Sequence, residues 1–250
     1  MKKALLLLTM LSVAPFVQAK DLIEYASVGD VAAVTNLLNL GSDPNMENDN
    51  AMTPLLASMV VCPVKENANV GNCSEVMMDL LGHHADPDYR FRADGQLNST
   101  LLMNVIVNSP MYMTAVPQLK HYGANMNAMD YNGNSALINL LNSHPVMAAD
   151  DKNKESKMKE WAHSMMDRTA VLLNNGASPN VLDDQHETAL SRLLDNKDMD
   201  YANTSEIINL MINAKLDKEL VVADGRNQEQ LIQNFYAKQM RLAKSNFTAV

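Results

Sequence analysis

Gly41-Ser-Asp-Pro-Asn45 is the first copy of a five-residue phrase that decides the fold of this 250-residue chain. The phrase returns as His84-Ala-Asp-Pro-Asp88, Gly123-Ala-Asn-Met-Asn127 and Gly176-Ala-Ser-Pro-Asn180, and a degraded fifth copy starts at Ala214. Each copy follows a stretch that contains leucine, and a glycine in the first position is typical of a helix that ends in a left-handed conformation. Repetition of one unit along a chain indicates an array of stacked repeats.

A hydroxyl residue that suits a helix start follows each of these four phrases. It lies twelve residues after the first residue of three phrases, and fifteen residues after His84 in the remaining one. Such a hydroxyl accepts a hydrogen bond from a backbone N–H that has no partner within the helix. We therefore expect helices to begin after Thr53, Ser99, Ser135 and Thr188, and to end at Gly41, Gly123 and Gly176.

The combined pattern resembles the ankyrin repeat, in which a helix starts at Thr-Pro-Leu, as at Thr53-Pro54-Leu55. A later helix of that repeat ends at Leu-Leu-x-x-Gly-Ala-(Asp/Asn)-x-Asn. The resemblance runs from about Leu22 to Asp217. It implies an all-α ankyrin-repeat solenoid of paired antiparallel helices with connecting hairpin loops. Stacked repeats form surfaces more often than catalytic pockets, so we expect a protein that binds other proteins. The histidine that usually follows Thr-Pro-Leu is absent, so we expect its capping network to be missing; the residues in its place are Leu56, Leu102, Ile138 and Ser191.

The N-terminus has the pattern of a secretory signal peptide. Lys2-Lys3 precedes an apolar stretch from Ala4 to Val13, and Val17-Gln18-Ala19 fits a cleavage site between small residues. We expect residues 1–19 to be removed and residues 20–250 to form one ankyrin-repeat domain. The expected repeats are 20–48, 49–94, 95–130, 131–183 and 184–223, followed by a C-terminal capping helix at 224–246.

The composition indicates in which compartment the protein works and which class of partner it can bind. The formal net charge is −9, and it becomes more negative if the leader is lost. Such a charge disfavours nucleic acid and anionic membranes, whereas it suits a basic partner or simply keeps the chain soluble. The apolar stretch of the leader is too short for an ordinary transmembrane helix. We expect an exported protein in the periplasm of a Gram-negative bacterium, without a membrane span and monomeric when free.

Cys62 and Cys73 lie in one insertion between the two helices of the second repeat. An oxidising compartment favours a disulfide between them, and closing so short a loop would add roughly 2–3 kcal/mol to stability. The alternatives are two separate thiols or a metal site. The nearest histidines, His83 and His84, stand at the far end of the following helix, which disfavours the metal site.

The longest insertion falls in the fourth repeat. Its apolar residues recur at helical spacing, so we expect one outer helix from Lys154 to Asn174, about 31 Å long. Its first half should project past the neighbouring repeats. The only tryptophan, Trp161, would stand on that part, with Met158 and Met165 on the same stripe. These three residues are either candidate contacts for a partner or the small core of the insertion itself. Insertions of this kind mark a binding face or reflect neutral drift in surface loops.

Motifs for catalysis are absent from the sequence, which has no Gly-x-Ser-x-Gly, no His-Glu-x-x-His and no phosphate-binding glycine loop. We expect neither an enzyme nor a bound cofactor or metal. The methionines between Met111 and Met129 have ligands for copper(I), but methionine is also a flexible core filler. Asp86 and Asp88 do not have the spacing of an EF-hand loop, and turn chemistry explains them.

These observations favour a non-enzymatic, exported protein-binding scaffold. Its most specific form is a periplasmic immunity or inhibitor protein that blocks an interbacterial toxin. The alternative is a periplasmic accessory protein that supports the envelope or the defence against oxidants.

Overall fold

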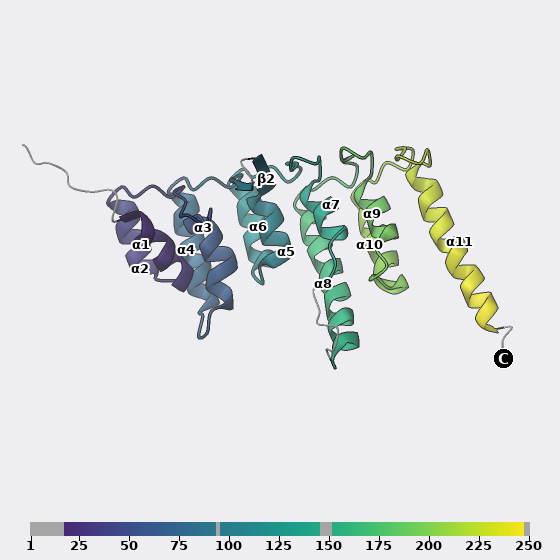
Figure 1. Cartoon of the computed structure of the whole chain (residues 1–250), viewed down its shortest axis with the longest axis horizontal. Coiled ribbons are helices and arrows are strands. Elements are labelled where there is room, and N and C mark those ends of the chain that lie inside the picture. Colours follow the sequence, from purple (N-terminus) through teal and green to yellow (C-terminus); the bar gives the residue numbers. More distant parts are fainter. Residues whose placement is uncertain (1–17, 94–95, 146–151, 248–250) are drawn as a thin grey trace, which may run out of the picture.

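The structure is a computed structural model that describes residues 18–93, 96–145 and 152–247. Helices dominate it and stand side by side in a row (Figure 1). The helical elements are α1 (Gln18–Val28), α2 (Val31–Asn39), α3 (Pro54–Leu56), the π-helix η1 (Ala57–Val61), the 3₁₀-helix η2 (Cys62–Val64), α4 (Val70–Gly82), α5 (Leu101–Asn108), α6 (Tyr112–His121), α7 (Ala136–Leu141), α8 (Lys154–Asn174), α9 (Ala189–Asp195), α10 (Tyr201–Asn213) and α11 (Gln228–Phe247).

The helices form five pairs and one final helix, in two rows. The first row contains α1, α3 with η1, α5, α7, α9 and α11, and the second row contains α2, α4, α6, α8 and α10. Each helix packs against the neighbouring member of its own row. One short antiparallel hairpin, β1 (Arg90–Ala93) and β2 (Gln96–Thr100), stands between the second and third pairs. The predicted all-α solenoid with long insertions between helices is therefore confirmed.

The core runs through the whole row as one continuous cluster of buried side chains. It extends from Leu22 in α1 to Ile232 in α11. In the described part of the chain, no helix combines the length and apolar character needed to cross a bilayer. The expected signal peptide lies outside the described residues except for Gln18 and Ala19, at which α1 begins.

The first residue of each phrase has a positive φ angle, as the sequence pattern requires. Gly41, Gly123 and Gly176 have φ between 90° and 97°, and His84 has 68° in the same position. In the last copy the positive φ belongs to Lys215, at 65°. The prediction that this copy starts at Ala214 is therefore wrong by one residue. The sequence did not fix the start of this copy, because neither Ala214 nor Lys215 is a glycine.

The last residue of the phrase joins each turn to the next turn along the row. The Asn45 amide donates to the His84 carbonyl at 3.1 Å, and its oxygen accepts from the Asp86 N–H at 2.6 Å. Asn127 and Asn180 make the same two bonds to the two turns that follow them. We call this pair of hydrogen bonds the bracket. Asp88 makes only half of it, because its carboxylate accepts from the Asn125 N–H at 2.8 Å but has no N–H to donate.

Three of the four predicted helix caps accept the hydrogen bond that defines a cap. The hydroxyls of Thr53, Ser135 and Thr188 accept from backbone N–H groups three residues later. The prediction of Ser99 is wrong, because Thr100 caps α5 and Ser99 belongs to β2. Ser99 instead accepts from the Asn104 amide at 3.0 Å. Two adjacent hydroxyl residues satisfy the same sequence rule, and the inserted hairpin shifts the cap by one position.

The register of the last phrase also explains α11. Asn227 lies twelve residues after Lys215 and accepts from the Gln230 N–H at 2.9 Å, while the Gln230 side chain accepts from the Asn227 N–H. Helix α11 therefore begins in the way that the first helix of a pair begins. The expected loss of capping networks is also wrong in two repeats. The Ser191 hydroxyl accepts from the Thr188 N–H at 2.9 Å, and the Met103 sulfur accepts from the Thr100 N–H at 3.4 Å.

Candidate protein-binding surface

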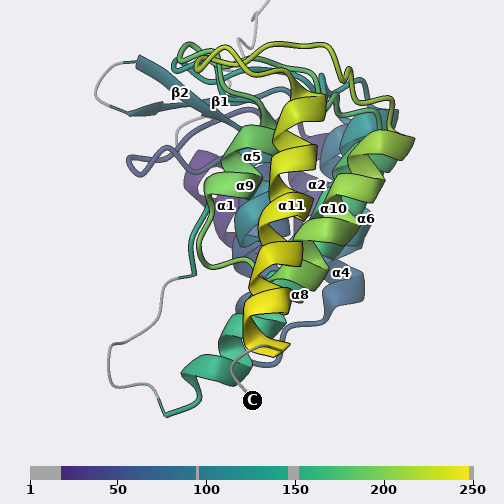
Figure 2. The ribbon, with the colours of Figure 1, turned by 90° about the vertical axis from the view of Figure 1, so that its right-hand side faces the viewer.

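One face of the solenoid is open to a partner. Its floor is the first row of helices. Along one edge of this floor stand the loops between successive pairs, which we call the fingers and which project to the same side (Figure 2). The fingers are residues 46–52, 89–99, 128–134, 181–187 and 219–226, with residues 94 and 95 outside the description. Helices of the first row pack against both neighbours and against the second row, so their exposed side chains face this open side.

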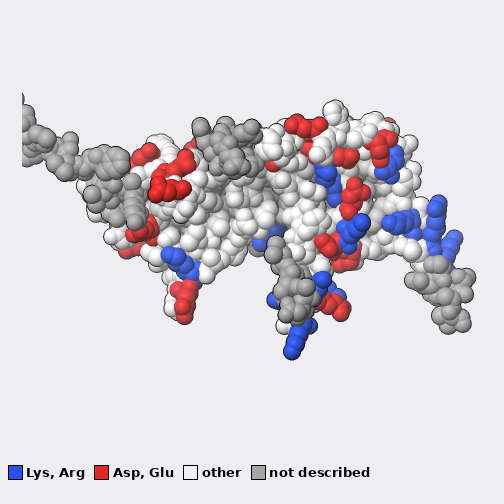
Figure 3. Space-filling view, viewed as in Figure 1, with Lys and Arg blue, Asp and Glu red and all other residues white. Residues whose placement is uncertain are grey.

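The floor of the open face carries few charges near its centre. Val107, Asn108 and Asn142 are exposed there, and Asn104 and Asn139 are half-buried. Amide side chains both donate and accept, so this floor can form hydrogen bonds with a protein surface without burying an unpaired charge. Figure 3 shows this face, with a largely uncharged middle and charged groups at its left end and over its right half. The exposed acids of the fingers are Glu47, Asp49, Asp184, Glu219 and Asp224.

Buried hydrogen bonds hold the fingers in shape. Asp183, with only 4% of its surface exposed, accepts from the N–H groups of Gln185 and Glu187. Its second oxygen accepts from Arg192 at 2.6 Å. Asp130 serves the preceding finger in the same way, by accepting from two backbone N–H groups and from the Asn139 amide. These bonds fix each finger relative to the first-row helix that follows it.

The third and fourth fingers also contact each other directly. The Asn132 carbonyl accepts from the Asp184 N–H at 3.1 Å. A β-carbon on Gly133, which has φ of 76°, would lie 2.7 Å from that same N–H. Only glycine fits this position, both because of its φ angle and because of the close approach. The two fingers therefore form one continuous edge of the open face.

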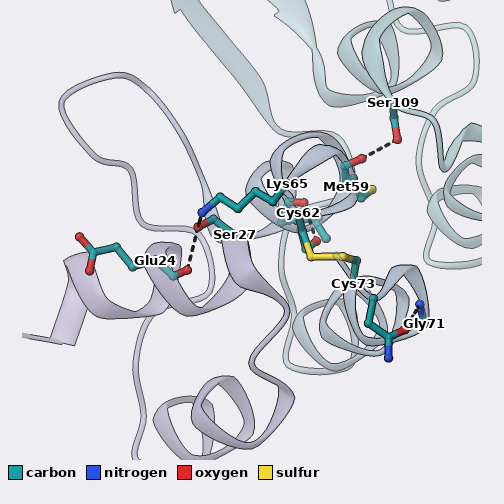
Figure 4. Close-up of a disulfide and its surroundings, with 11 residues drawn as sticks. Glu24, Ser27, Met59, Cys62, Lys65, Gly71, Cys73 and Ser109 are labelled. Atoms are coloured by element: carbon teal, nitrogen blue, oxygen red, sulfur yellow. Dashed lines mark hydrogen bonds between the residues drawn. A yellow bond between two sulfur atoms is a disulfide. The ribbon is translucent and has the colours of Figure 1, made fainter. Parts of the chain in front are cut away.

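The insertion of the second pair is closed by a disulfide between Cys62 and Cys73, whose Cα atoms are 5.8 Å apart (Figure 4). Both cysteines are buried, and Met111 of the third pair completes their small apolar cluster. Lys65 of the same insertion donates to the Ser27 hydroxyl in α1 at 3.0 Å. Ser109 donates to the Met59 carbonyl in η1. This insertion is therefore fastened to the pairs on both sides of it.

The insertion of the fourth pair is the long helix α8, with the bounds that the sequence predicts. Its first half projects beyond the neighbouring helices at the edge opposite the fingers (Figure 1). Trp161 is half-buried and packs against the core with one side, and Met158 is half-buried farther out. Met165 is only 2% exposed. The helical stripe turns inward at this residue, so Met165 offers almost none of its surface to a partner on the outside of α8.

Arg168 joins α8 to the third pair. Its guanidinium donates to the Ile106 carbonyl and to the Ser109 carbonyl, and so satisfies groups at the end of α5 that a helix leaves without partners. It also lies 4.2 Å above the ring of Tyr112. Burial lowers the pKa of Arg168, and burial, together with the nearby Asp167 carboxylate, raises the pKa of Tyr112. Sequence reasoning missed Arg168, because no local pattern shows which helix end a distant arginine reaches.

Solved structures match this chain over most of its length. A crystal structure of an ankyrin repeat domain from Acinetobacter baumannii superposes with a TM-score of 0.55 at 17% sequence identity, and covers 87% of this chain and 92% of its own. The fold is that of an ankyrin-repeat domain. No protein-family model and no curated protein sequence matches the chain. The likeness therefore establishes the ankyrin fold and leaves the activity to the residues themselves.

Within this ankyrin fold, the described residues hold no group of three or more histidine, cysteine, aspartate or glutamate side chains placed to bind a metal. Asp86 and Asp88 are engaged in the turn, where the Asp86 side chain accepts from the Asp88 N–H. Met111 and Met126 are buried in the core, whereas Met113 and Met129 are exposed. The methionines between Met111 and Met129 are therefore not gathered around one common site facing solvent.

Proposed function

We propose that this protein is an exported, non-enzymatic binding module that holds a partner protein on its open face. The observation that carries this proposal is the uncharged floor of Val107, Asn108 and Asn142 on the first row of helices, which the acidic fingers flank on one side. An interface needs a central area that can be desolvated at little cost and a polar rim around it. The floor supplies the first and the fingers supply the second. The acidic fingers suit a partner whose own rim is basic.

In its most specific form, the module is a periplasmic immunity or inhibitor protein that covers the active site of an interbacterial toxin. The leader pattern at residues 1–19 supports export. The buried disulfide supports an oxidising compartment, because such bonds persist there and are rare in the cytosol. A preformed surface with fixed fingers suits inhibition, since little conformational entropy is lost when the partner binds.

The test is co-expression of the mature chain with the product of the adjacent gene. Rescue of growth and copurification of the two proteins are the expected results, and failure of both rejects the immunity role. Asn142→Lys places a cation on the floor and should weaken the complex at least tenfold. The matched control is Thr114→Lys at an exposed position of α6 in the second row, which should leave affinity unchanged.

Trp161 and Met158 remain candidate contacts on the projecting part of α8. If a partner reaches that edge as well as the floor, Trp161→Ala lowers affinity at least tenfold. Unchanged affinity for Trp161→Ala would restrict the interface to the floor and fingers. A deletion strain that is sensitive to peroxide, together with an adjacent gene product that is not toxic, would instead favour the envelope and oxidative-stress role.

A further inference from the structure

A cavity of about 460 Å³ lies beneath the projecting half of α8, where the ends of α5 and α7 meet that helix. We call it the α8 pocket. It shares Val107 with the floor and otherwise lies apart from the floor and fingers described above. Val107, Leu140, Pro145, Trp161 and Met165 give it an apolar wall, and Arg168 also lines it. A volume of this size is within the range of sites that enclose a small organic group.

The Arg168 guanidinium has donors to spare in this pocket. It has five N–H donors, and Nε and Nη1 account for three of them through Ser164, Ile106 and Ser109. No hydrogen bond joins Nη2 to any residue in the described part of the chain. No carboxylate of those residues lies within ion-pair distance of Arg168 either. A partly buried cation is usually paired, so this one lacks the anion that such groups normally have.

The other charged groups of the pocket lie at its mouth. Glu160 is exposed and accepts from the Ser156 hydroxyl at 3.1 Å. His144 contacts Asp198 at 2.7 Å, and Lys157 is exposed. A dianion would meet repulsion from Glu160 on entry and would find only the two free N–H groups of one guanidinium. A single carboxylate matches those two donors, and its stem would pack beside Trp161.

We propose that the α8 pocket binds a carboxylate on an apolar stem, and that the partner protein supplies this group from an acidic side chain or its chain end. The proposal rests on the proposed function for the source of the carboxylate. The pocket itself can be tested without any partner. Binding would complete the ion pair of Arg168 and would also bury the exposed side of Trp161.

The test uses the fluorescence of Trp161, which is the only tryptophan in the chain and therefore reports on this pocket alone. The probes are phenylacetate, its neutral amide phenylacetamide and the cation phenethylamine. We expect phenylacetate to change the emission saturably, and both other probes to bind at least tenfold more weakly. No response to phenylacetate, or equal affinity for the amide, would overturn the proposal.

Substitutions at the pocket separate charge from shape. Arg168→Lys keeps the positive charge but loses the planar fork of the guanidinium, and should weaken the binding of phenylacetate at least fivefold.

Val107→Phe fills the pocket at a position that is 39% exposed, and should abolish the fluorescence response without loss of fold. Val221→Phe, at an exposed position of the last finger, is its matched control and should bind as the unmodified protein does. Glu160→Gln removes the repulsion and should strengthen binding about twofold. Binding of phenylacetate to Val107→Phe with unchanged affinity would place it elsewhere and reject the pocket.

The source of the carboxylate has its own test. Once a partner is identified by copurification, its affinity for Arg168→Lys should fall in parallel with that of phenylacetate, because Arg168 lines the pocket and is not part of the floor. If phenylacetate binds the pocket but the partner binds Arg168→Lys as tightly as the unmodified protein, the partner does not supply the carboxylate. If no partner exists at all, the proposed function fails while the result with phenylacetate stands.

Discussion

The second and fourth helix pairs both carry an insertion at the edge opposite the fingers, but the two insertions are held in opposite ways. In the second pair, a disulfide and bonds to Ser27 and Met59 fasten the insertion region to its neighbours. In the fourth pair, the insertion extends a helix into solvent, and Arg168 joins the base of that helix to the end of α5. The difference teaches that the length of an insertion does not indicate its role. The bonds at its base decide whether it reinforces the core or presents a surface.

Removal of the disulfide should have the largest effect on stability, and it tests whether this bond holds the insertion of the second pair. Cys62→Ser with Cys73→Ser should lower the free energy of unfolding by about 3 kcal/mol, because the unfolded chain regains the freedom of the closed loop. Denaturant unfolding measures the loss, and limited proteolysis should find new cleavage in residues 65–69. An unchanged midpoint would show that the insertion of the second pair is held by packing alone.

The next largest effect is expected at the base of α8. Arg168→Met leaves the carbonyls of Ile106 and Ser109 without their charged donor, so we expect a loss of about 2 kcal/mol. The same measurement on Arg241→Met, at an exposed position of α11, serves as the control and should show almost no change. Equal results for the two variants would mean that Arg168 does not hold the base of α8 to the end of α5.

The turns that follow the two pairs provide a smaller and reciprocal test. Asp88→Asn after the second pair supplies the missing donor to the Gly123 carbonyl, and should raise stability by about 1 kcal/mol. Asn180→Asp after the fourth pair removes the donor to the Lys215 carbonyl, and should lower stability by a similar amount. Thermal unfolding of both variants measures these changes. If both substitutions raised stability, or both lowered it, the hydrogen bonds of the bracket would not stabilise the turns as described.

The smallest expected effect concerns the exposed half of α8. A hydrogen bond from Lys159 lowers the pKa of Glu155 below its ordinary value of 4.5. The stabilisation is therefore present above that value and is lost as the pH falls through the lowered pKa. Helicity measured by circular dichroism should fall slightly in this acid range. Glu155→Gln should abolish the Glu155 contribution to that change, since it leaves no group to titrate there.

The sequence predicted the parts of this molecule that depend on local backbone chemistry. Glycines at the phrase starts and a hydroxyl before each helix constrain only their own neighbourhood, so Thr53 and Gly176 could be interpreted without a structure. The bounds of α8 followed from helical periodicity in the same way. Where two local solutions compete, as at Ser99 and Thr100, the choice depends on the pairing of β1 with β2, which lies beyond the local pattern.

The candidate sites were less accessible to sequence reasoning. Met165 has the same spacing as Trp161 on the α8 stripe, and only the packing of α8 against α6, α7 and α10 decides that it is buried. The amides of the floor come from separate repeats and show no motif in the chain. Arg168 is 62 residues from the carbonyl that it caps. Such relations arise when the rows of helices assemble, so the sequence contains the residues but not their neighbours.

Each bracket reaches only the turn beside it, and α1 and α11 stand at opposite ends of the row (Figure 1). The array of helix pairs is therefore open at both ends. Cleavage or thermal fraying that starts at one terminus can advance inward one pair at a time while the far terminus stays intact. Amide hydrogen exchange should accordingly be slowest near α7 and should become faster towards either extremity.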